Sequence, residues 1–265
     1  MKEAENLGVN LLWRTPVRGI EPGGVRLEHS VFTVRWIIGA DGSASRVRRW
    51  SGLDTPRRRM QRSAVRRHYR VRPWSDYAEV HWGASSQAYV TPISGEEVCI
   101  VVMAERHEDA NFERALDDLP ELRERLGSAE LASRERGAIT AMYSLRCVSQ
   151  GNVALVGDAS GGVDAITGEG LRLAFQQAHV LAEALEARDL SRYENAHRQL
   201  ARRPRWMGNL MLRLAGNPWL RERAMRTMHR RPELFERLLA IHVGDATPKD
   251  VLATGARFSW QFLGA

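Results

Sequence analysis

The sequence has few of the features that mark secreted, membrane-spanning or metal-binding proteins. Its only two cysteines, Cys99 and Cys147, lie far apart in apolar or mixed stretches, so we expect two core thiols and no disulfide. No Cys/His cluster has the spacing of metal ligands. The apolar runs are no longer than a strand, and the first ten residues lack the apolar centre of a signal peptide. We therefore expect a cytoplasmic protein that has no transmembrane helix and binds no metal.

Lysine is also scarce. Only Lys2 and Lys249 are lysines, so 37 of the 39 basic residues are arginine, and the formal net charge is +7. The arginines are scattered among acidic residues, and no DNA- or RNA-binding motif accompanies them. We therefore expect no nucleic-acid partner. The 43% of hydrophobic and 27% of charged residues suit a globular chain that buries a core, in one large or two small domains.

The chain is organised around residues 152–178. A short apolar run, Val153 to Val156, predicts a buried strand that ends at Gly157-Asp158. A loop of small residues follows, and Thr167-Gly-Glu-Gly170 begins a helix with apolar residues at helical spacing. A carboxylate at the end of a strand can accept hydrogen bonds from a diol such as ribose. The glycines let a planar ligand approach the main chain, and the helix start favours negative charge. The alternative is an ordinary strand–turn–helix unit whose glycines only serve turns.

A second stretch, residues 34–49, has a related pattern. An apolar run leads into Gly39-Ala-Asp-Gly42, and Ser43 or Ser45 can cap the helix that follows. The segment 39–49, GADGSASRVRR, resembles the DG motif of FAD-dependent monooxygenases and their relatives. The later Gly157-Asp158 with Gly168-Glu-Gly170 resembles the GD motif of the same flavoproteins. The form DAITGEG, residues 164–170, is most similar to the geranylgeranyl-reductase branch. The resemblance covers roughly residues 1 to 200.

The resemblance implies a bound FAD and a set of residues that hold it. It makes Asp41, Gly42 and Arg46 candidates for contacts on the flavin side; their alternative is a turn aspartate followed by a solvent-facing arginine. Asp158, after Gly157, would hold the ribityl or pyrophosphate region. The N–H groups of Gly168, Glu169 and Gly170 would face the edge of the flavin ring where negative charge develops on reduction.

The chain departs from the family at its start. Family members begin with a strand–GxGxxG–helix unit that holds the ADP half of FAD, and no such stretch is present here. Residues 2–20 resemble the segment between that unit and the DG motif. We therefore weigh a second interpretation, in which this chain is an FAD-incompetent fragment or one half of a split flavoprotein. A separate partner chain would then supply the missing unit, and this chain would act as an interaction module for that partner.

The predicted fold is α/β, or α+β overall. A partial Rossmann-like FAD/NAD(P)-binding domain, residues 1–55 and 148–190, is interrupted by an antiparallel substrate sheet, residues 56–147, and followed by a helical region, residues 191–265. Short strands are also expected at 8–13, 16–20, 24–28 and 31–38. Four aromatic or imidazole side chains of the sheet are candidates for the substrate pocket: Tyr69, His81, Trp82 and Tyr89. Alternation predicts that Trp82 faces the core or a cavity. His81 is either a general acid or a satisfied histidine, and no catalytic group is identified.

The predicted function is that of an FAD-dependent oxidoreductase with NAD(P)H as electron donor. By resemblance it would hydroxylate an apolar small molecule or reduce a carbon–carbon double bond. The helices expected at 191–215, 218–229 and 232–241 are rich in Met, Trp and Arg. They would either cap the substrate domain or touch a membrane surface from one side.

Overall fold

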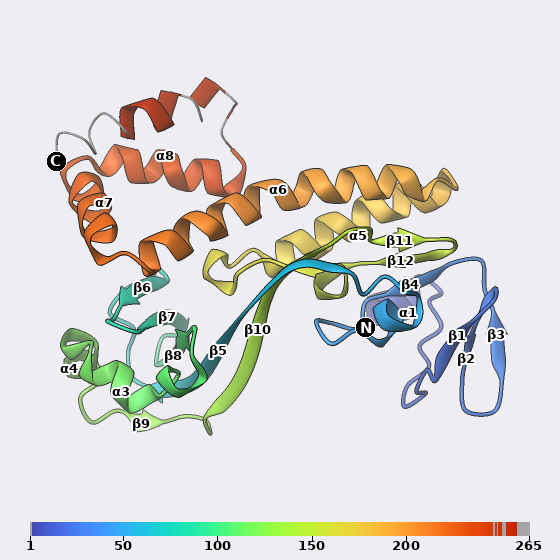
Figure 1. The fold of residues 1–265 in the computed structure, drawn as a ribbon. Helices are drawn as coiled ribbons and strands as arrows, with labels where there is room; N and C mark the ends of the chain where they lie inside the picture. Colours follow the sequence, from blue (N-terminus) through green and yellow to red (C-terminus); the bar gives the residue numbers. More distant parts are fainter. Residues whose placement is uncertain (1, 246, 248, 251–252, 259–265) are drawn as a thin grey trace. The chain divides into compact units, whose positions relative to one another are not determined.

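The computed structural model describes residues 2–245, 247, 249–250 and 253–258. The chain forms two compact units (Figure 1). The first contains Met1–Arg58, Tyr143–Gly162 and Gly170–Leu200, and the second contains the remaining segments, Arg59–Met142, Val163–Glu169 and Ala201–Ala265. The mixed α/β class that the sequence predicts is confirmed.

The first unit is built on a small sheet that contains a parallel pair of strands. β4 (Ile37–Gly39) runs parallel to β12 (Val153–Leu155), with Ile38 opposite Ala154, and β11 (Ser149–Gln150) pairs antiparallel with β12. The order β11-β12-β4 leaves β4 at an edge. All three residues of β12 are buried, as expected for a strand covered on both faces.

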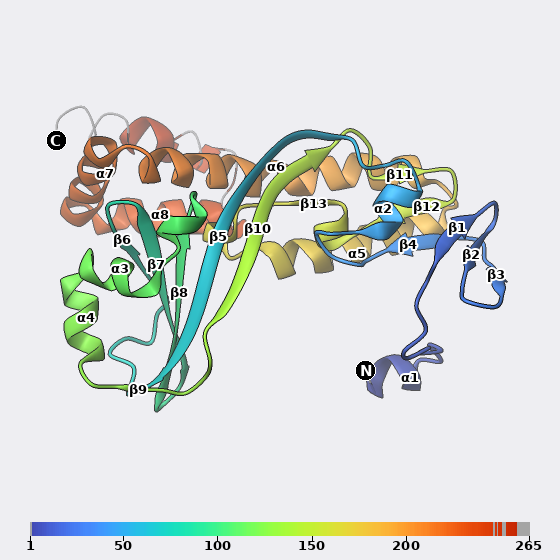
Figure 2. The same cartoon turned by 60° about the horizontal axis from the view of Figure 1, so that its bottom comes forward.

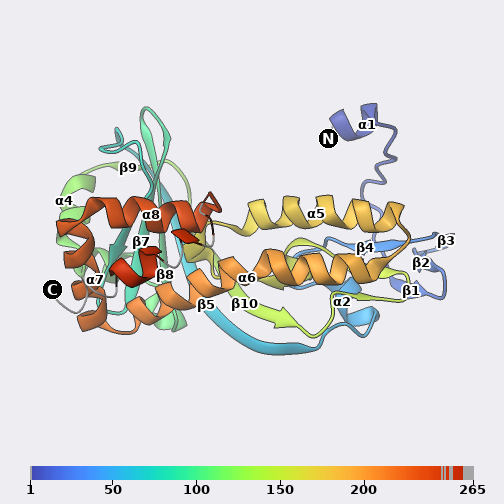
Figure 3. The same ribbon diagram turned by 90° about the horizontal axis from the view of Figure 1, so that it is seen from above.

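Two helices of the first unit run side by side, as Figures 1 and 3 both show: α5 (Gly170–Glu186) and the first part of α6 (Leu190–Ala215). α5 buries Leu173, Gln177, Leu181 and Ala184, one helical face. From α6, the fully buried Tyr193 donates its hydroxyl hydrogen to the carbonyl of Leu155, at 2.5 Å. The central strand is thereby tied to this helix.

The N-terminal segment differs from the expected run of strands. It begins with α1 (Lys2–Asn6), and residues 8–13 form no strand, with Leu12 and Trp13 more than half exposed. β1 (Gly19–Glu21), β2 (Gly24–Arg26) and β3 (Val31–Thr33) form an antiparallel meander. The strand expected over 31–38 is divided into β3 and β4, because β3 pairs with β2 and β4 pairs with β12.

The second unit contains an antiparallel sheet, which confirms the sheet expected from the sequence. Its strands follow the order β10-β5-β8-β7-β6, and β9 also pairs with β5. The bounds are β5 (Pro56–Arg70), β6 (Glu79–Trp82), β7 (Ser86–Ser94), β8 (Glu97–Ala104), β9 (Glu130–Leu131) and β10 (Arg136–Leu145). The long strands β5 and β10 continue into the first unit, where the end of β10 pairs with β13 (Gly161–Gly162). Figure 2 shows these two long strands side by side.

One face of this sheet carries the main hydrophobic core. α3 (Phe112–Asp117) and α4 (Pro120–Leu126) contribute Phe112, Leu116 and Leu122 to it, and they pack on Ala88, Val90, Val98 and Ile100 of the central strands. Cys99 is buried, in agreement with the expectation of a core thiol. Cys147 is exposed, and that expectation was wrong for it, because it follows the end of β10 in a connecting segment.

The helices of the second unit follow the sequence pattern closely. α6 continues through Pro204, which lies inside the helix. α7 (Pro218–Arg230) and α8 (Pro232–Val243) both begin with a proline in the first turn, where its missing N–H costs nothing. No helix among the described residues is long and apolar enough to cross a membrane.

Candidate functional site

Asp41 lies in the turn that follows β4 and organises the start of α2 (Arg46–Trp50). Its carboxylate accepts hydrogen bonds from the Ser45 hydroxyl at 2.5 Å and from the N–H groups of Arg46 and Val47 at 2.7 and 3.2 Å. Partial burial opposes ionisation, but these hydrogen bonds outweigh it and hold the pKa of Asp41 below its ordinary value. The sequence-predicted Asp41 is thus a turn-forming residue, whatever else it contacts.

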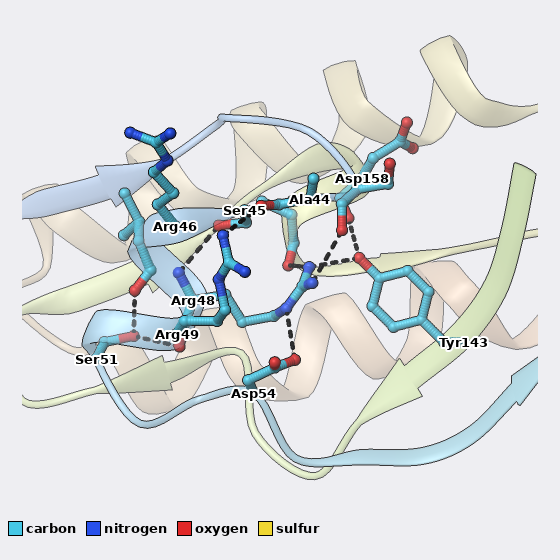
Figure 4. A network of polar contacts seen from close by, with 12 residues as sticks. Ala44, Ser45, Arg46, Arg48, Arg49, Ser51, Asp54, Tyr143 and Asp158 are labelled. Atoms are coloured by element: carbon cyan, nitrogen blue, oxygen red, sulfur yellow. Dashed lines mark hydrogen bonds and ion pairs between the residues drawn. The ribbon is translucent and has the colours of Figure 1, made fainter. Parts of the chain in front are cut away.

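Gly42 and Arg46 complete this turn. Gly42 has φ +76°, and a Cβ added there would meet no atom within 4 Å, so the main chain is open on that side. The Arg46 side chain is exposed, and Figure 4 shows it pointing away from the buried contacts around Arg48. Both features leave room for a ligand at the turn.

The arginine that connects the two motifs is Arg48, which the sequence reading missed. It is 5% exposed, and its Nε donates to Asp54 at 2.9 Å. One terminal nitrogen donates to the Tyr143 hydroxyl at 2.6 Å and to the Ala159 carbonyl at 3.1 Å, and the other donates to the Ser43 carbonyl at 2.9 Å (Figure 4). Arg48 therefore bonds the turn after β4 to the turn after β12.

Gly157 and Asp158 form that second turn, at the carboxyl end of β12. Gly157 has φ +61°, and its N–H donates to the Gln177 side chain of α5 at 2.8 Å. The Asp158 carbonyl accepts from the Tyr143 hydroxyl. The Asp158 carboxylate is exposed and has no hydrogen-bond partner among the residues that the structure describes. It can therefore accept hydrogen bonds from a ligand.

A buried pair of polar side chains, Ser160 and His197, holds this turn through a hydrogen bond. The Ser160 hydroxyl donates to the Gly157 carbonyl at 2.8 Å and lies 2.9 Å from Nε2 of His197. Both side chains are at most 3% exposed. A serine this deeply buried cannot reach a substrate, so the pair is structural.

The segment 163–169 belongs to the second unit and makes its own local bonds. The Gly168 N–H, expected to face a ligand, donates instead to the Ala165 carbonyl at 3.1 Å and closes a 3₁₀ turn. The Glu169 side chain is 5% exposed and lies 3.5 Å from Nε2 of His242, which donates to the Thr167 carbonyl at 3.0 Å. α5 begins at Gly170, where an added Cβ would meet no atom within 4 Å.

The second unit also holds a buried charge pair that the sequence reading missed. Arg62 and Asp164 are each 4% exposed and lie 3.2 Å apart. Arg62 also donates to the Gln87 side chain at 2.8 Å, and Gln87 accepts from the Tyr89 hydroxyl at 3.1 Å. Burial raises the pKa of Tyr89. These bonds fix the segment around Asp164 to the sheet.

The four pocket candidates divide between the two faces of the sheet. Residues directly opposite each other on paired strands share a face, and neighbours along a strand alternate. Trp82 is opposite Gln87, so Trp82 and Tyr89 lie on the face of Gln87. His81 is opposite Ala88, which belongs to the core face.

The two candidates on the core face make local contacts. Tyr69 is 8% exposed and packs against Phe112, with ring centroids 5.9 Å apart. His81 lies 3.0 Å from the Glu79 carboxylate, which also accepts from the Trp74 indole at 3.0 Å. Trp74, Tyr77 and Glu79 line a shallow groove on the second unit. Tyr69 thus packs in the core, and His81 has a carboxylate partner.

Residues 17–196 match a protein family described as an FAD binding domain. The chain belongs to this FAD binding domain family. The match contains both aspartate turns, so the expected FAD-dependent monooxygenase superfamily and its flavin cofactor are confirmed at the level of the family. No curated protein matches the chain.

Solved flavoprotein structures share the fold. CmlS, a flavin-dependent halogenase, is 21% identical with a TM-score of 0.64, over 77% of this chain and 42% of CmlS. The flavin-dependent brominase Bmp2 is 16% identical with a TM-score of 0.64, over 98% of this chain and 73% of Bmp2. PqsL of P. aeruginosa, in complex with 2-aminobenzoylacetate, is 25% identical with a TM-score of 0.59, over 81% of this chain and 65% of PqsL. The chain thus spans from less than half to about three quarters of these proteins.

The residues present fit an FAD molecule. The exposed Asp158 carboxylate is unpartnered among the described residues, and the backbone at Gly42 and Gly170 is open. Asp158 follows the carboxyl end of a parallel strand, the usual ligand position in such sheets.

Proposed function

We propose that the protein is an FAD-dependent oxidoreductase that hydroxylates an apolar small molecule, with NAD(P)H as electron donor. The observation that carries the proposal is the Arg48 bridge, which joins the Asp41 turn to the Asp158 turn within one unit. Hydroxylation is favoured over double-bond reduction by the likeness to a probable FAD-dependent monooxygenase, PqsL, at 26% identity and a TM-score of 0.52.

Each residue has a limited role in this proposal. Bound FAD supplies the redox chemistry. Asp158 accepts hydrogen bonds from ribityl hydroxyls, and the Asp41 turn presents the open backbone of Gly42 and the exposed Arg46 to the cofactor. The first N–H groups of α5, from Gly170 onward, favour negative charge. Gly168 uses its own N–H within the 3₁₀ turn and therefore has no role as a donor in this proposal.

For the substrate, we propose the sheet face that carries Trp82 and Tyr89. Tyr89 is oriented by its hydrogen bond to Gln87, and Trp82 is half-buried, with the Arg221 guanidinium 5.5 Å from its ring centroid. An aromatic surface with one oriented hydroxyl suits an apolar molecule that has a single polar group.

A flavin titration tests the cofactor role. The full chain is titrated with FAD while the visible spectrum and flavin fluorescence are followed. Asp158→Ala should weaken binding about tenfold, because hydrogen bonds to a charged group contribute about 1.5–3 kcal/mol. The matched control is Asp76→Ala, an exposed aspartate of the second unit. Equal affinity of Asp158→Ala and the parent would refute the role of Asp158.

Electron transfer is tested separately. With FAD present, NADH or NADPH oxidation is followed at 340 nm, with and without small aromatic compounds. We expect oxidation that consumes oxygen and rises when a substrate is present. FAD binding without NAD(P)H oxidation would leave the flavoprotein proposal standing and remove the proposed electron donor.

A second candidate function is that of one half of a split flavoprotein, as the sequence also suggested. The supporting observation is that β4 lies at a sheet edge while nearby apolar side chains of the first unit are exposed: Ile38 by 37%, Leu171 by 77% and Phe175 by 73%. An edge strand can accept a further strand. A strand–GxGxxG–helix segment, fused to the chain or added as a separate chain, should then raise FAD affinity at least tenfold. Unchanged affinity, with FAD bound by the chain alone, would exclude this candidate.

A further inference from the structure

The C-terminal helices carry an excess of positive charge. Residues 201–245 contain ten arginines and only four acidic residues, an excess of six. In the rest of the chain, 29 basic and 28 acidic residues nearly cancel in sum, although residues 46–72 contain eleven arginines and a single acidic residue. Residues 201–245 all belong to the second unit and lie beyond the segment that matches the FAD binding domain family.

α7 presents much of this charge on one face, together with an aromatic side chain. Trp219, Arg223, Arg226 and Arg230 follow each other at spacings of four, three and four residues, which places them on one helical stripe. Trp219 is 59% exposed, and Arg223 lies 5.5 Å from its ring centroid. The buried residues of this helix are Ala224 and Thr227. Glu222 lies 3.8 Å from Arg226 as an acidic neighbour on this face.

α8 adds an exposed apolar stripe. Phe235, Leu239 and Val243 are spaced by four residues and are 54%, 48% and 45% exposed, while Leu234 and Ile241 are buried on the other side. A single residue, Arg231, separates α8 from α7, and the two helices contact each other (Figure 1). A basic, tryptophan-bearing stripe and an apolar stripe are therefore joined in one helical pair.

We propose that α7 and α8 form a docking surface for a bilayer that contains anionic lipid. Arginine heads contact lipid phosphates while their stems, Trp219 and the α8 stripe enter the boundary between headgroups and acyl chains. The excess of positive charge in residues 201–245 complements anionic lipid, and the exposed Trp219 and Phe235 favour a lipid interface over a nucleic acid. The proposal is independent of the flavin site.

Vesicle co-sedimentation of the full chain tests the proposal. Vesicles of phosphatidylcholine with about 30% phosphatidylglycerol are compared with pure phosphatidylcholine at about 50 mM and about 300 mM salt. We expect binding to the anionic vesicles only, and weaker binding at high salt. Absence of binding to anionic vesicles at low salt would overturn the proposal.

Two matched double variants separate the contribution of the α7 face to vesicle binding from that of the overall net charge. Arg226→Glu with Arg230→Glu should weaken vesicle binding at least about thirtyfold, because each basic residue near an anionic surface contributes a factor of about five. Arg134→Glu with Arg146→Glu makes the same change of net charge at exposed positions outside these helices and should retain most binding. Equal loss in both pairs would show non-specific attraction and refute the docking surface. The neutral double variant Arg226→Gln with Arg230→Gln should lose an intermediate amount of vesicle binding. It keeps the proposal testable if the Arg226→Glu with Arg230→Glu variant fails to fold.

The apolar component has its own test. Trp219→Ala and Phe235→Ser should each weaken vesicle binding, with little effect on its salt dependence. A single-stranded RNA of mixed sequence serves as the competing polyanion. If RNA binds more tightly than the vesicles and neither variant changes vesicle binding, the surface is a general anion-binding face and the membrane proposal fails.

Discussion

At the scale of single residues, Arg48 is the contact on which the arrangement of the two aspartate turns depends. Arg48→Met leaves the Ser43 and Ala159 carbonyls without their donor and removes the partner of Asp54. We expect a loss of about 2–4 kcal/mol in the free energy of unfolding, as for other broken buried networks. Urea denaturation measures it. Arg46→Met, an exposed position two residues earlier, should change stability by less than about 0.5 kcal/mol; similar losses in both variants would contradict this role of Arg48.

Asp41 makes a pH-dependent contribution to the free energy of unfolding. Its folded pKa lies below its ordinary value, so the unfolded chain binds a proton at Asp41 more readily than the folded chain does. The stabilisation is therefore complete above the unfolded pKa, about 3.9, and is lost as the pH falls through the folded value. Asp41→Asn should be less stable than the parent at pH 7, and the difference should shrink below about pH 4. A difference that is constant from pH 7 to pH 3 would contradict the assignment.

The ion pair of Arg62 and Asp164 can be tested by a double-mutant cycle, because both of its charges are buried. Arg62→Met should lower stability by about 3–5 kcal/mol, since it removes one charge of a buried ion pair. The double variant Arg62→Met with Asp164→Leu should recover much of this loss, because no unpaired charge remains. Thermal or urea unfolding of the four proteins in the cycle measures the coupling. A double variant that is worse than the sum of the two single variants would exclude an ion pair.

At the scale of elements, β4 depends on close packing against its neighbour. A Cβ added at Gly39 would lie 2.7 Å from the Leu155 side chain and 2.8 Å from that of Val47. Gly39→Ala should therefore destabilise the first unit by about 1–3 kcal/mol. Gly95→Ala is the matched control, since an added Cβ there meets nothing within 4 Å and the backbone φ is not positive. Unfolding curves should separate the two variants, and equal stabilities would contradict the close approach.

The elements that could be predicted from the sequence are those whose pattern is local. The apolar run before Gly157, the helix that begins at Gly170 and the helices expected at 218–229 and 232–241 were all visible, because neighbouring residues decide them. Pairing across long separations was not visible. Arg48 and Tyr143 are 95 residues apart, and Arg62 and Asp164 are 102 apart.

Side-chain direction could be predicted only in part. Alternation along β6 predicts that His81 and Trp82 point to opposite faces, as they do. It does not say which face receives α3 and α4, so Tyr69 was counted with the pocket although it belongs to the core. Likewise, the glycines before α5 predicted a turn, but not that Gly168 would use its N–H to close it.

At the scale of the whole molecule, the proposed flavin role and the proposed membrane role belong to different segments and should respond to different ligands. Hydrogen exchange followed by mass spectrometry can locate both responses in one protein. FAD should slow exchange in peptides that contain residues 41–47 and 157–160 together, because Arg48 ties these turns into one structure. Anionic vesicles should slow exchange in peptides from α7 and α8 and leave the two turns unchanged.

The pattern of protection decides between the alternatives. Binding of FAD at a hundred times its Kd stabilises the protein by about 2.7 kcal/mol, enough to slow exchange about a hundredfold wherever opening releases the ligand. Protection of only one aspartate turn would show that the two motifs do not bind one molecule. Protection of both turns without any change in α7 and α8 is the result expected if the first unit binds the flavin and the C-terminal helices serve a separate surface.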